Sequence, residues 1–174
     1  MAKKRLMVLL AMCLLISAAV VYAGRRADKA SKADPMLHID IPVKLESANV
    51  VLNIDRDNLL GDSSIAIGHL NLLAMRFGGW NTKGQVIGLF HTEAGYMTLD
   101  DGPYNAERNV TTGNPYKSQL VELMKHGVQI ELCGATAAFH HWSNSEIIPG
   151  IKVNTDAMVR LTQLHEQGYA EIKE

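Results

Sequence analysis

The protein has 174 residues, 47% of them hydrophobic, and its 17 lysines and arginines nearly balance 18 aspartates and glutamates, which leaves a formal net charge of −1. This length suits one domain with a sizeable hydrophobic core. A chain without a basic patch or an aromatic-studded basic stripe is a poor nucleic-acid binder and a poor candidate for binding anionic membrane surfaces.

Residues 1–23 have the three-part layout of a secretory signal peptide. Lysine and arginine at positions 3–5 form a basic start, residues 6–21 form an apolar run broken only by Ser17, and Val21-Tyr22-Ala23 offers small residues where a signal peptidase reads them. The apolar run is shorter than the roughly 20 residues that span a bilayer, which disfavours the alternative of an uncleaved membrane anchor. We therefore expect cleavage after Ala23 and export to the periplasm, with no membrane attachment of the mature chain.

The cysteine count follows from this cleavage. Removal of residues 1–23 takes away Cys13 and leaves Cys133 as the only cysteine of the mature chain. An intramolecular disulfide would then be impossible. A leftover cysteine in an exported protein indicates a reactive thiol or a bond to another chain. The alternative is an inert, buried thiol.

Residues 24–36 are small and charged without periodicity, so we interpret them as a flexible lead to a single domain over residues 37–174. The domain is expected to open with an extended piece at residues 38–43. A short apolar run at residues 48–54, rich in branched residues, predicts a buried strand. The polar residues 55–62 predict a loop.

A broad apolar face from residue 63 to Phe77 predicts a helix, which we expect Gly78-Gly79 to stop. Residues 85–90 predict a second strand. The long segment at residues 91–113 shows no clear period, and loops of this length usually form lids or interface elements.

In the rest of the domain, capping residues and glycines mark the ends of the predicted helices. Asn114 and Pro115 predict the start of a helix and Gly127 its end, with Lys125 and His126 complementing the C-terminal end of the helix dipole. After this helix we predict a strand at residues 128–132, ending at Cys133, and a helix that starts in the small residues 134–138. A compact turn at 144–150 then leads to a strand at 151–153. The last predicted elements are a helix from its N-cap Thr155 to Gly168, with Met158, Leu161 and Leu164 on one face, and a strand at 169–172.

Strands that alternate with helices predict an α/β fold, here a three-layer α/β/α arrangement with a mainly parallel sheet of about five strands covered on both faces. Ligands of such sheets collect at the carboxyl ends of the strands. Cys133 stands at one of these ends and His91 at another, so these two residues are the candidate site. We expect no cofactor.

Cys133 lies where a strand enters a helix, and this position favours the thiolate form because unpaired backbone N–H groups and the positive end of a helix dipole are near. Small neighbours leave room for a sulfur atom or another protein's thiol to approach. We therefore expect Cys133 to be displayed, with a protonated His91 as its proton partner or electrostatic helper. The alternatives are a cysteine that fills the end of a strand and a structural histidine.

His140 and His141 follow Cys133 by seven and eight residues, about 10–12 Å along a helix axis. This is too far for a hydrogen bond to the thiol within one subunit. The pair could cap the helix, line an interface or hold a metal ion. No cysteine or carboxylate stands at a supporting spacing, so we expect no metal site.

Three stretches in the second half resemble the DsrE/DsrF-like family of sulfur-relay proteins: GVQIELCG at residues 127–134, IIPGIKV at 147–153 and LTQLHEQGYAEI at 161–172. The resemblance implies a three-layer α/β/α fold, assembly as a homo-oligomer (trimer or hexamer) and a persulfide on the cysteine that corresponds to Cys133. Two features depart from it. Thr92 follows His91 where many relatives have a glycine, and the best-known relatives are cytoplasmic.

The sequence therefore predicts an exported sulfur-relay protein of the sulfurtransferase type, with Cys133 and His91 as its site. Its partners would be a sulfur donor or acceptor protein, or a small sulfane-sulfur compound. The alternative is a non-enzymatic subunit or a small-molecule binding module in which Cys133 is structural.

Overall fold

The computed structural model describes residues 38–174. The predicted signal peptide at residues 1–23 and the predicted lead at residues 24–36 therefore lie outside the described residues. The chain divides into two units, Met1–Val43 and Lys44–Glu174. Residues 38–43 of the first unit form no helix or strand, and the second unit holds the helices and strands described below. Within residues 38–174, no helix combines the length and the apolar character needed to cross a membrane.

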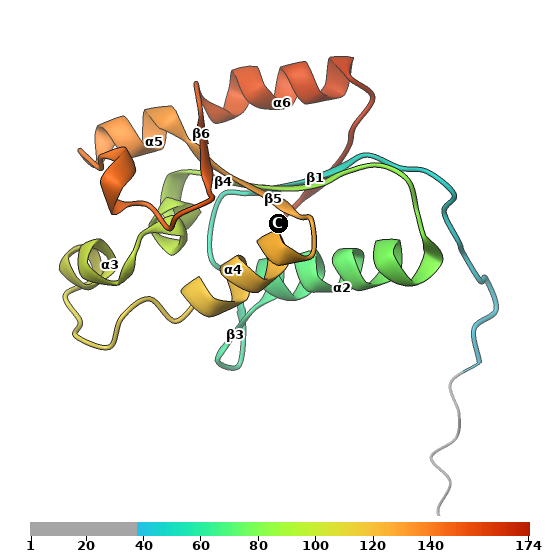
Figure 1. The fold of residues 1–174 in the computed structure, drawn as a ribbon, viewed down its shortest axis with the longest axis horizontal. Helices are drawn as coiled ribbons and strands as arrows, with labels where there is room; N and C mark the ends of the chain where they lie inside the picture. Colours follow the sequence, from blue (N-terminus) through green and yellow to red (C-terminus); the bar gives the residue numbers. More distant parts are fainter. Residues whose placement is uncertain (1–37) are drawn as a thin grey trace, which may run out of the picture. The chain divides into compact units, whose positions relative to one another are not determined.

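Five short strands form one sheet (Figure 1). In sheet order they are β6 (Lys152–Asn154), β5 (Gln129–Cys133), β4 (Val86–Phe90), β1 (Val50–Ile54) and β7 (Ala170–Lys173). Every neighbouring pair is parallel, which confirms the predicted mainly parallel sheet. All side chains of β1 and β4 are buried, as expected for central strands that are covered on both faces.

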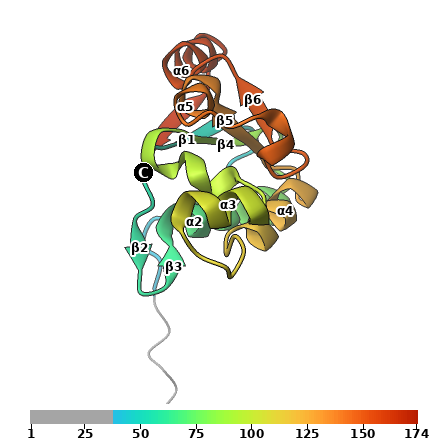
Figure 2. The ribbon, with the colours of Figure 1, turned by 90° about the vertical axis from the view of Figure 1, so that its left-hand side faces the viewer.

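Helices cover both faces of this sheet, which confirms the three-layer α/β/α architecture. The helices α2 (Ile65–Trp80) and α4 (Lys117–Lys125) lie on one face, and α5 (Gly134–Phe139) and α6 (Ala157–Glu166) lie on the other (Figures 1 and 2). Side chains alternate along a strand, so each central strand supplies two separate cores. The core under α6 contains Val51, Ile87, Leu89, Cys133, Ala157 and Leu164.

The helix α2 runs three residues past Phe77, so the expectation that Gly78-Gly79 would stop it is wrong. The residue that ends the helix is Asn81, which adopts the left-handed conformation (φ 55°), and its N–H bonds to the Gly78 carbonyl. Asparagine is the usual substitute for glycine at this position. The predicted polar loop at residues 55–62 contains β2 (Leu59–Leu60), which pairs antiparallel with β3 (Ser63–Ser64), so the helix begins at Ile65 and not at the predicted residue 63.

The segment at residues 91–113 is largely helical, which corrects its interpretation as a loop without regular structure. It contains the 3₁₀ helix η1 (Thr92–Thr98) and the α-helix α3 (Asp101–Arg108). Ala94, Met97 and Leu99 are fully buried, so η1 belongs to the core. A 3₁₀ helix lacks the 3.6-residue period that reveals an α-helix in a sequence, and α3 is too short to show one. Asp100 is the residue that could have indicated α3 in the sequence, because it is the N-cap of this helix and accepts a hydrogen bond from the N–H of Asp101.

The helices α4 and α6 end where the sequence predicts, but the N-cap predicted for each of them is wrong. Gly127, with φ 85°, follows the end of α4. Asn114 does not cap α4 directly; its side chain accepts from the Tyr116 N–H and donates to two carbonyls of the preceding segment. Asp156, not the predicted Thr155, caps α6 and accepts from the Val159 N–H at 2.8 Å. A short 3₁₀ turn, η2 (Asn144–Glu146), precedes β6.

Candidate functional site

Cys133 and His91 occupy neighbouring positions at the carboxyl edge of the sheet. The strands β4 and β5 are paired up to Phe90 and Leu132, and each of the two candidates is the next residue of its strand. Leu89 packs in the same core as Cys133, on the α6 face. Because side chains alternate along a strand, His91 lies on this face too. The structure therefore brings together the two residues that the sequence selects.

The thiol of Cys133 is buried, so the expectation that it is displayed is wrong for the isolated chain. The residue is 4% exposed. Its Sγ accepts two backbone hydrogen bonds, from the N–H of Thr136 at 3.5 Å and from the N–H of Ala157 at 3.3 Å. Thr136 belongs to the first turn of α5, and Ala157 is the first residue of α6. N–H groups directed at a sulfur favour its thiolate form.

The turn between β6 and α6 covers Cys133 and is packed tightly against the start of α5. A Cβ atom on Gly134 would lie 2.3 Å from the carbonyl oxygen of Asn154 and 2.9 Å from that of Thr155. Only glycine permits this approach, because any side chain would displace one of the two backbones. The cover of Cys133 has to move before a reagent reaches the sulfur, and this turn, residues 154–157, is part of that cover.

A buried ion pair ties α6 to the strand that carries Cys133. Glu131 is 2% exposed, and it accepts from Arg160 Nε at 2.9 Å and from Arg160 Nη2 at 2.7 Å. Asn154 Nδ2, at 3.0 Å, and Gln129 Nε2, at 2.6 Å, also donate to its carboxylate. Burial alone would raise the pKa of Glu131, but the hydrogen bonds from Arg160, Asn154 and Gln129 outweigh it and lower the pKa.

Glu131 was not among the site residues predicted from the sequence, although a signal was present. A single carboxylate inside an apolar strand has to find a partner, since charged side chains are almost never fully buried alone. Its partner Arg160 lies 29 residues further along the chain. The pair anchors both sides of the turn that covers Cys133.

His91 is held by two uncharged partners, Asn53 and Thr92. Its Nε2–H donates to Asn53 Oδ1 at 2.6 Å, since that amide oxygen can only accept, and its Nδ1 accepts from the Thr92 hydroxyl at 2.6 Å. Burial lowers the pKa of His91, and the charges of Asp55 and Glu171 oppose this only in part. Neither recorded hydrogen bond of the imidazole goes to Cys133. The expectation of a protonated His91 that helps the thiol is therefore wrong.

Thr92 has a positive φ of 50°, which is unusual for a residue with a branched Cβ. This is the position at which the sequence departs from the glycine of many relatives, and a left-handed backbone explains why glycine suits it. The Thr92 N–H donates to the hydroxyl of Thr136 at 3.0 Å. The bond connects the turn after β4 to the first turn of α5.

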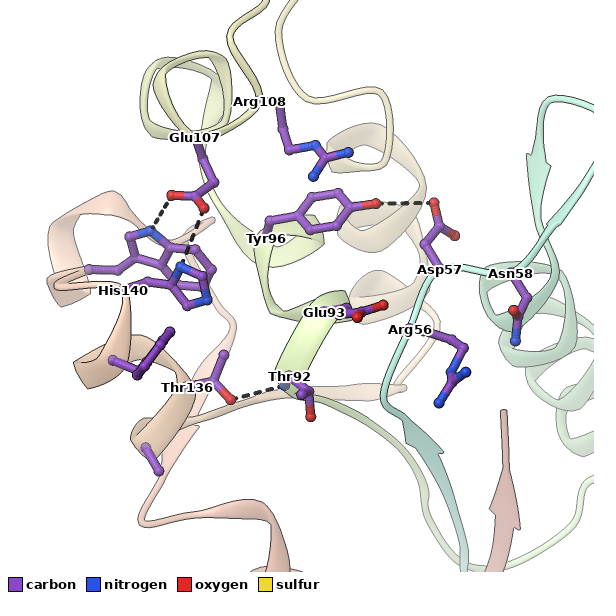
Figure 3. Close-up of a pocket in the computed structure, with 13 residues that line it drawn as sticks. Arg56, Asp57, Asn58, Thr92, Glu93, Tyr96, Glu107, Arg108, Thr136 and His140 are labelled. Atoms are coloured by element: carbon purple, nitrogen blue, oxygen red, sulfur yellow. Dashed lines mark hydrogen bonds and ion pairs between the residues drawn. The ribbon is translucent and has the colours of Figure 1, made fainter.

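A cavity of about 890 Å³ opens beside this connection (Figure 3). Its lining residues come from the loop after β1, from η1, α3 and α5, and from Trp142; Cys133 is not among them. Thr136 joins the two places, because its side chain lines the cavity and its N–H donates to the Cys133 sulfur.

His140 belongs to the wall of this cavity. Its ring stacks on Trp142, with ring centroids 4.4 Å apart. Glu107 holds both rings, through an ion pair with His140 Nδ1 at 3.3 Å and a hydrogen bond from Trp142 Nε1 at 3.2 Å. His141 has a positive φ of 60° at the end of α5. Among residues 38–174, no group of three or more histidine, cysteine, aspartate or glutamate side chains could hold a metal ion.

The fold and the site define a class of protein: a parallel α/β/α domain with a cysteine at the carboxyl end of a central strand, beneath the start of a helix. Residues 51–173 match the DsrE/DsrF-like family, and the chain belongs to this family. This confirms the resemblance seen in the three stretches of the second half.

Solved structures agree on the fold. The chain is similar to a protein of unknown function, MTH1491, from Methanobacterium thermoautotrophicum, with 16% identity, a TM-score of 0.56 and coverage of 73% of this chain and 99% of that one. It is also similar to the ychN protein from E. coli, with 16% identity, a TM-score of 0.51 and coverage of 74% and 99%. A comparison with curated proteins gave no match.

Proposed function

We propose that this protein carries sulfur as a persulfide on Cys133 and passes it to the thiol of a partner. The observation that carries the proposal is the pair of backbone N–H groups, from Thr136 and Ala157, that donate to the Cys133 sulfur. Two such donors suit a sulfur that bears negative charge during the reaction. Membership of the DsrE/DsrF-like family, which is generally linked to sulfur relay, supports the same conclusion.

The chemistry needs no cofactor and no external oxidant. The Cys133 thiolate attacks the outer sulfur of a small sulfane-sulfur compound or of a donor protein's persulfide. A new S–S bond forms on Cys133 and the bond to the outer sulfur of the donor breaks. A persulfide donor leaves as a thiolate that takes up a proton, and a small sulfane-sulfur compound leaves as the anion that remains when its outer sulfur is removed. A thiolate of the acceptor then attacks the outer sulfur on Cys133 and releases the original thiolate. His91, as a neutral imidazole, acts in this scheme by filling the space beside Cys133.

Loading with a persulfide donor and intact-mass measurement tests the proposal. The full chain with Cys13→Ser should gain one sulfur atom, and reduction should remove it. The same chain with Cys133→Ser should gain none. Absence of the added sulfur in a folded protein, under conditions in which a free thiol is loaded, would overturn the proposal.

Export and self-assembly are part of the proposed function. The signal-peptide pattern of residues 1–23 supports cleavage after Ala23 and a periplasmic location. Exposed apolar side chains support a homo-oligomer, either a trimer or a hexamer: Phe139 on α5 is 80% exposed, and Met158 and Val159 on α6 are 79% and 59% exposed. Met158 was expected on one face of the helix with Leu161 and Leu164, but it is exposed whereas Leu164 is buried, and its exposure leaves an apolar surface on α6. N-terminal sequencing of the native protein and light scattering test these two points.

A binding module with a structural cysteine is the second candidate, because the burial of Cys133 favours it. In that case iodoacetamide would modify Cys133 only after denaturation. Modification of the native protein would decide for the sulfur carrier, provided that prior loading with sulfur places the added group on the outer sulfur, from which reduction removes it.

A further inference from the structure

The cavity beside α5 has the volume and lining of a ligand site. Its volume of about 890 Å³ lies in the range of small-molecule pockets, roughly 300–1,000 Å³. One wall is aromatic and is fixed by Glu107, which holds the stacked rings of His140 and Trp142. A wall held in this way needs no rearrangement when a ligand packs against it.

Two lining residues carry opposite charges and have no charged partner. Arg108 and Glu93 make no ion pair within the described part of the chain. Of the other charged lining residues, Arg56 pairs with Asp55, Asp57 accepts hydrogen bonds from the hydroxyls of Tyr96 and Tyr116, and Glu107 contacts His140 and Trp142. The guanidinium of Arg108 stacks on the ring of Tyr96, with Cζ 4.2 Å from the ring centroid. In the view of Figure 3, Tyr96 lies between Arg108 and Glu93. In that view the cavity thus offers an unpaired cation and an unpaired anion, with the ring of Tyr96 between them.

We propose that this cavity binds a small zwitterion, an amino acid or a short peptide with a free ammonium and a free carboxylate. The carboxylate pairs with Arg108, the ammonium pairs with Glu93, and the side chain packs against the wall formed by His140 and Trp142. An anion alone would leave Glu93 without a partner, and a cation alone would leave Arg108 without one. The inference concerns binding only, so it stands or falls independently of the persulfide on Cys133.

Three probes of nearly equal shape test the charge requirement. L-phenylalanine carries both charges, 3-phenylpropionate lacks the ammonium and 2-phenylethylamine lacks the carboxylate. Titration calorimetry, with the fluorescence of Trp142 as a second readout in a Trp80→Phe background, should show the tightest binding for L-phenylalanine. Each missing charge should weaken binding about tenfold, the size expected for one charge-assisted hydrogen bond.

Variants assign each charge to its residue. Arg108→Gln should abolish the advantage of L-phenylalanine over 2-phenylethylamine, and Glu93→Gln its advantage over 3-phenylpropionate. Arg76→Gln is the matched control for arginine, because Arg76 also stacks on an aromatic ring, that of Trp80, away from the cavity. Cys133→Ser should bind as the unchanged protein does.

Three results would overturn the inference: equal binding of the three probes, no binding by any of them to the folded protein, or an equal loss in Arg76→Gln and Arg108→Gln. A self-assembled protein whose subunit contacts close the cavity would give the second result.

Discussion

The N–H of Ala157 lies 3.3 Å from the Sγ of Cys133, although 24 residues separate them in the chain. The first residue of α6 therefore both stabilises negative charge on the sulfur and blocks the way to it. A sulfur carrier built like this has to uncover its thiol for each transfer, and the residues that hold the turn before α6 determine how readily it does so.

Gly134→Ala should uncover the thiol. The added Cβ meets the carbonyl oxygen of Asn154 at 2.3 Å, so the turn before α6 has to move away. We expect a loss of about 2 kcal/mol in unfolding free energy, as for other overpacked sites, and faster alkylation of Cys133 by iodoacetamide in the native protein. Gly102→Ala is the control, because a Cβ there meets nothing within 4 Å. Equal behaviour of the two variants would show that the turn does not limit access.

Glu131→Gln should destabilise the protein by about 2 kcal/mol at neutral pH, because it leaves the partly buried guanidinium of Arg160 without its counter-charge. The pKa of Glu131 is lowered in the fold, so its contribution is fully present above the ordinary value of 4.5 and is lost as the pH falls through the folded value. The difference between the unchanged protein and the variant should therefore shrink in acid. Urea denaturation at several pH values measures it. A difference that stays constant down to the lowest accessible pH contradicts the assignment.

Thr92→Gly should be more stable than Thr92→Ala. Both variants lose the hydroxyl that donates to His91, but only glycine relieves the positive φ of 50°. The gap should be about 1–2 kcal/mol, the cost of a left-handed backbone for a residue with a Cβ. Chemical denaturation of the two variants gives the comparison directly. If alanine proves as stable as glycine, the backbone at residue 92 is not strained.

His91→Gln should reduce the sensitivity of the protein to mild acid. The pKa of His91 is lowered by burial in the fold, while the unfolded chain keeps a value near 6.5. As the pH falls through 6.5 the unfolded state takes up a proton and the folded state does not, so stability falls with pH. The stability lost between neutral pH and mild acid should be smaller in the variant. The opposite result would mean that the folded imidazole is protonated.

The sequence predicts the sheet well because its strands are continuous runs of apolar residues bounded by turns. Residues 48–54 and 85–90 read as buried strands and contain β1 and β4. The adjacency of Cys133 and His91 followed from the same information, since the carboxyl ends of parallel strands share one edge. Burial of Cys133 could not be predicted in this way. It depends on the packing of the turn before α6, which is close to Gly134 only in the folded chain.

Two other features lay beyond the reach of local patterns. The helix α2 ends at a left-handed asparagine instead of a glycine, and tertiary contacts decide which residue adopts that conformation. The charge of Glu131 is compensated by Arg160 on another element, a pairing that depends on the order of the strands. Neither the end of α2 nor the partner of Glu131 can be predicted from windows of a few residues.

The pairing of β1 with β7 has a consequence for the nascent chain. Val50, in the first strand, pairs with Ala170, close to the last described residue, and α6 lies just before β7. Contacts this distant in sequence form late, because a long loop has to close first. While the chain emerges, β5 is complete before α6 exists, so Cys133 is made without its cover. During this interval the Cys133 thiol is accessible to oxidants, and it becomes buried when α6 and β7 have folded onto the sheet.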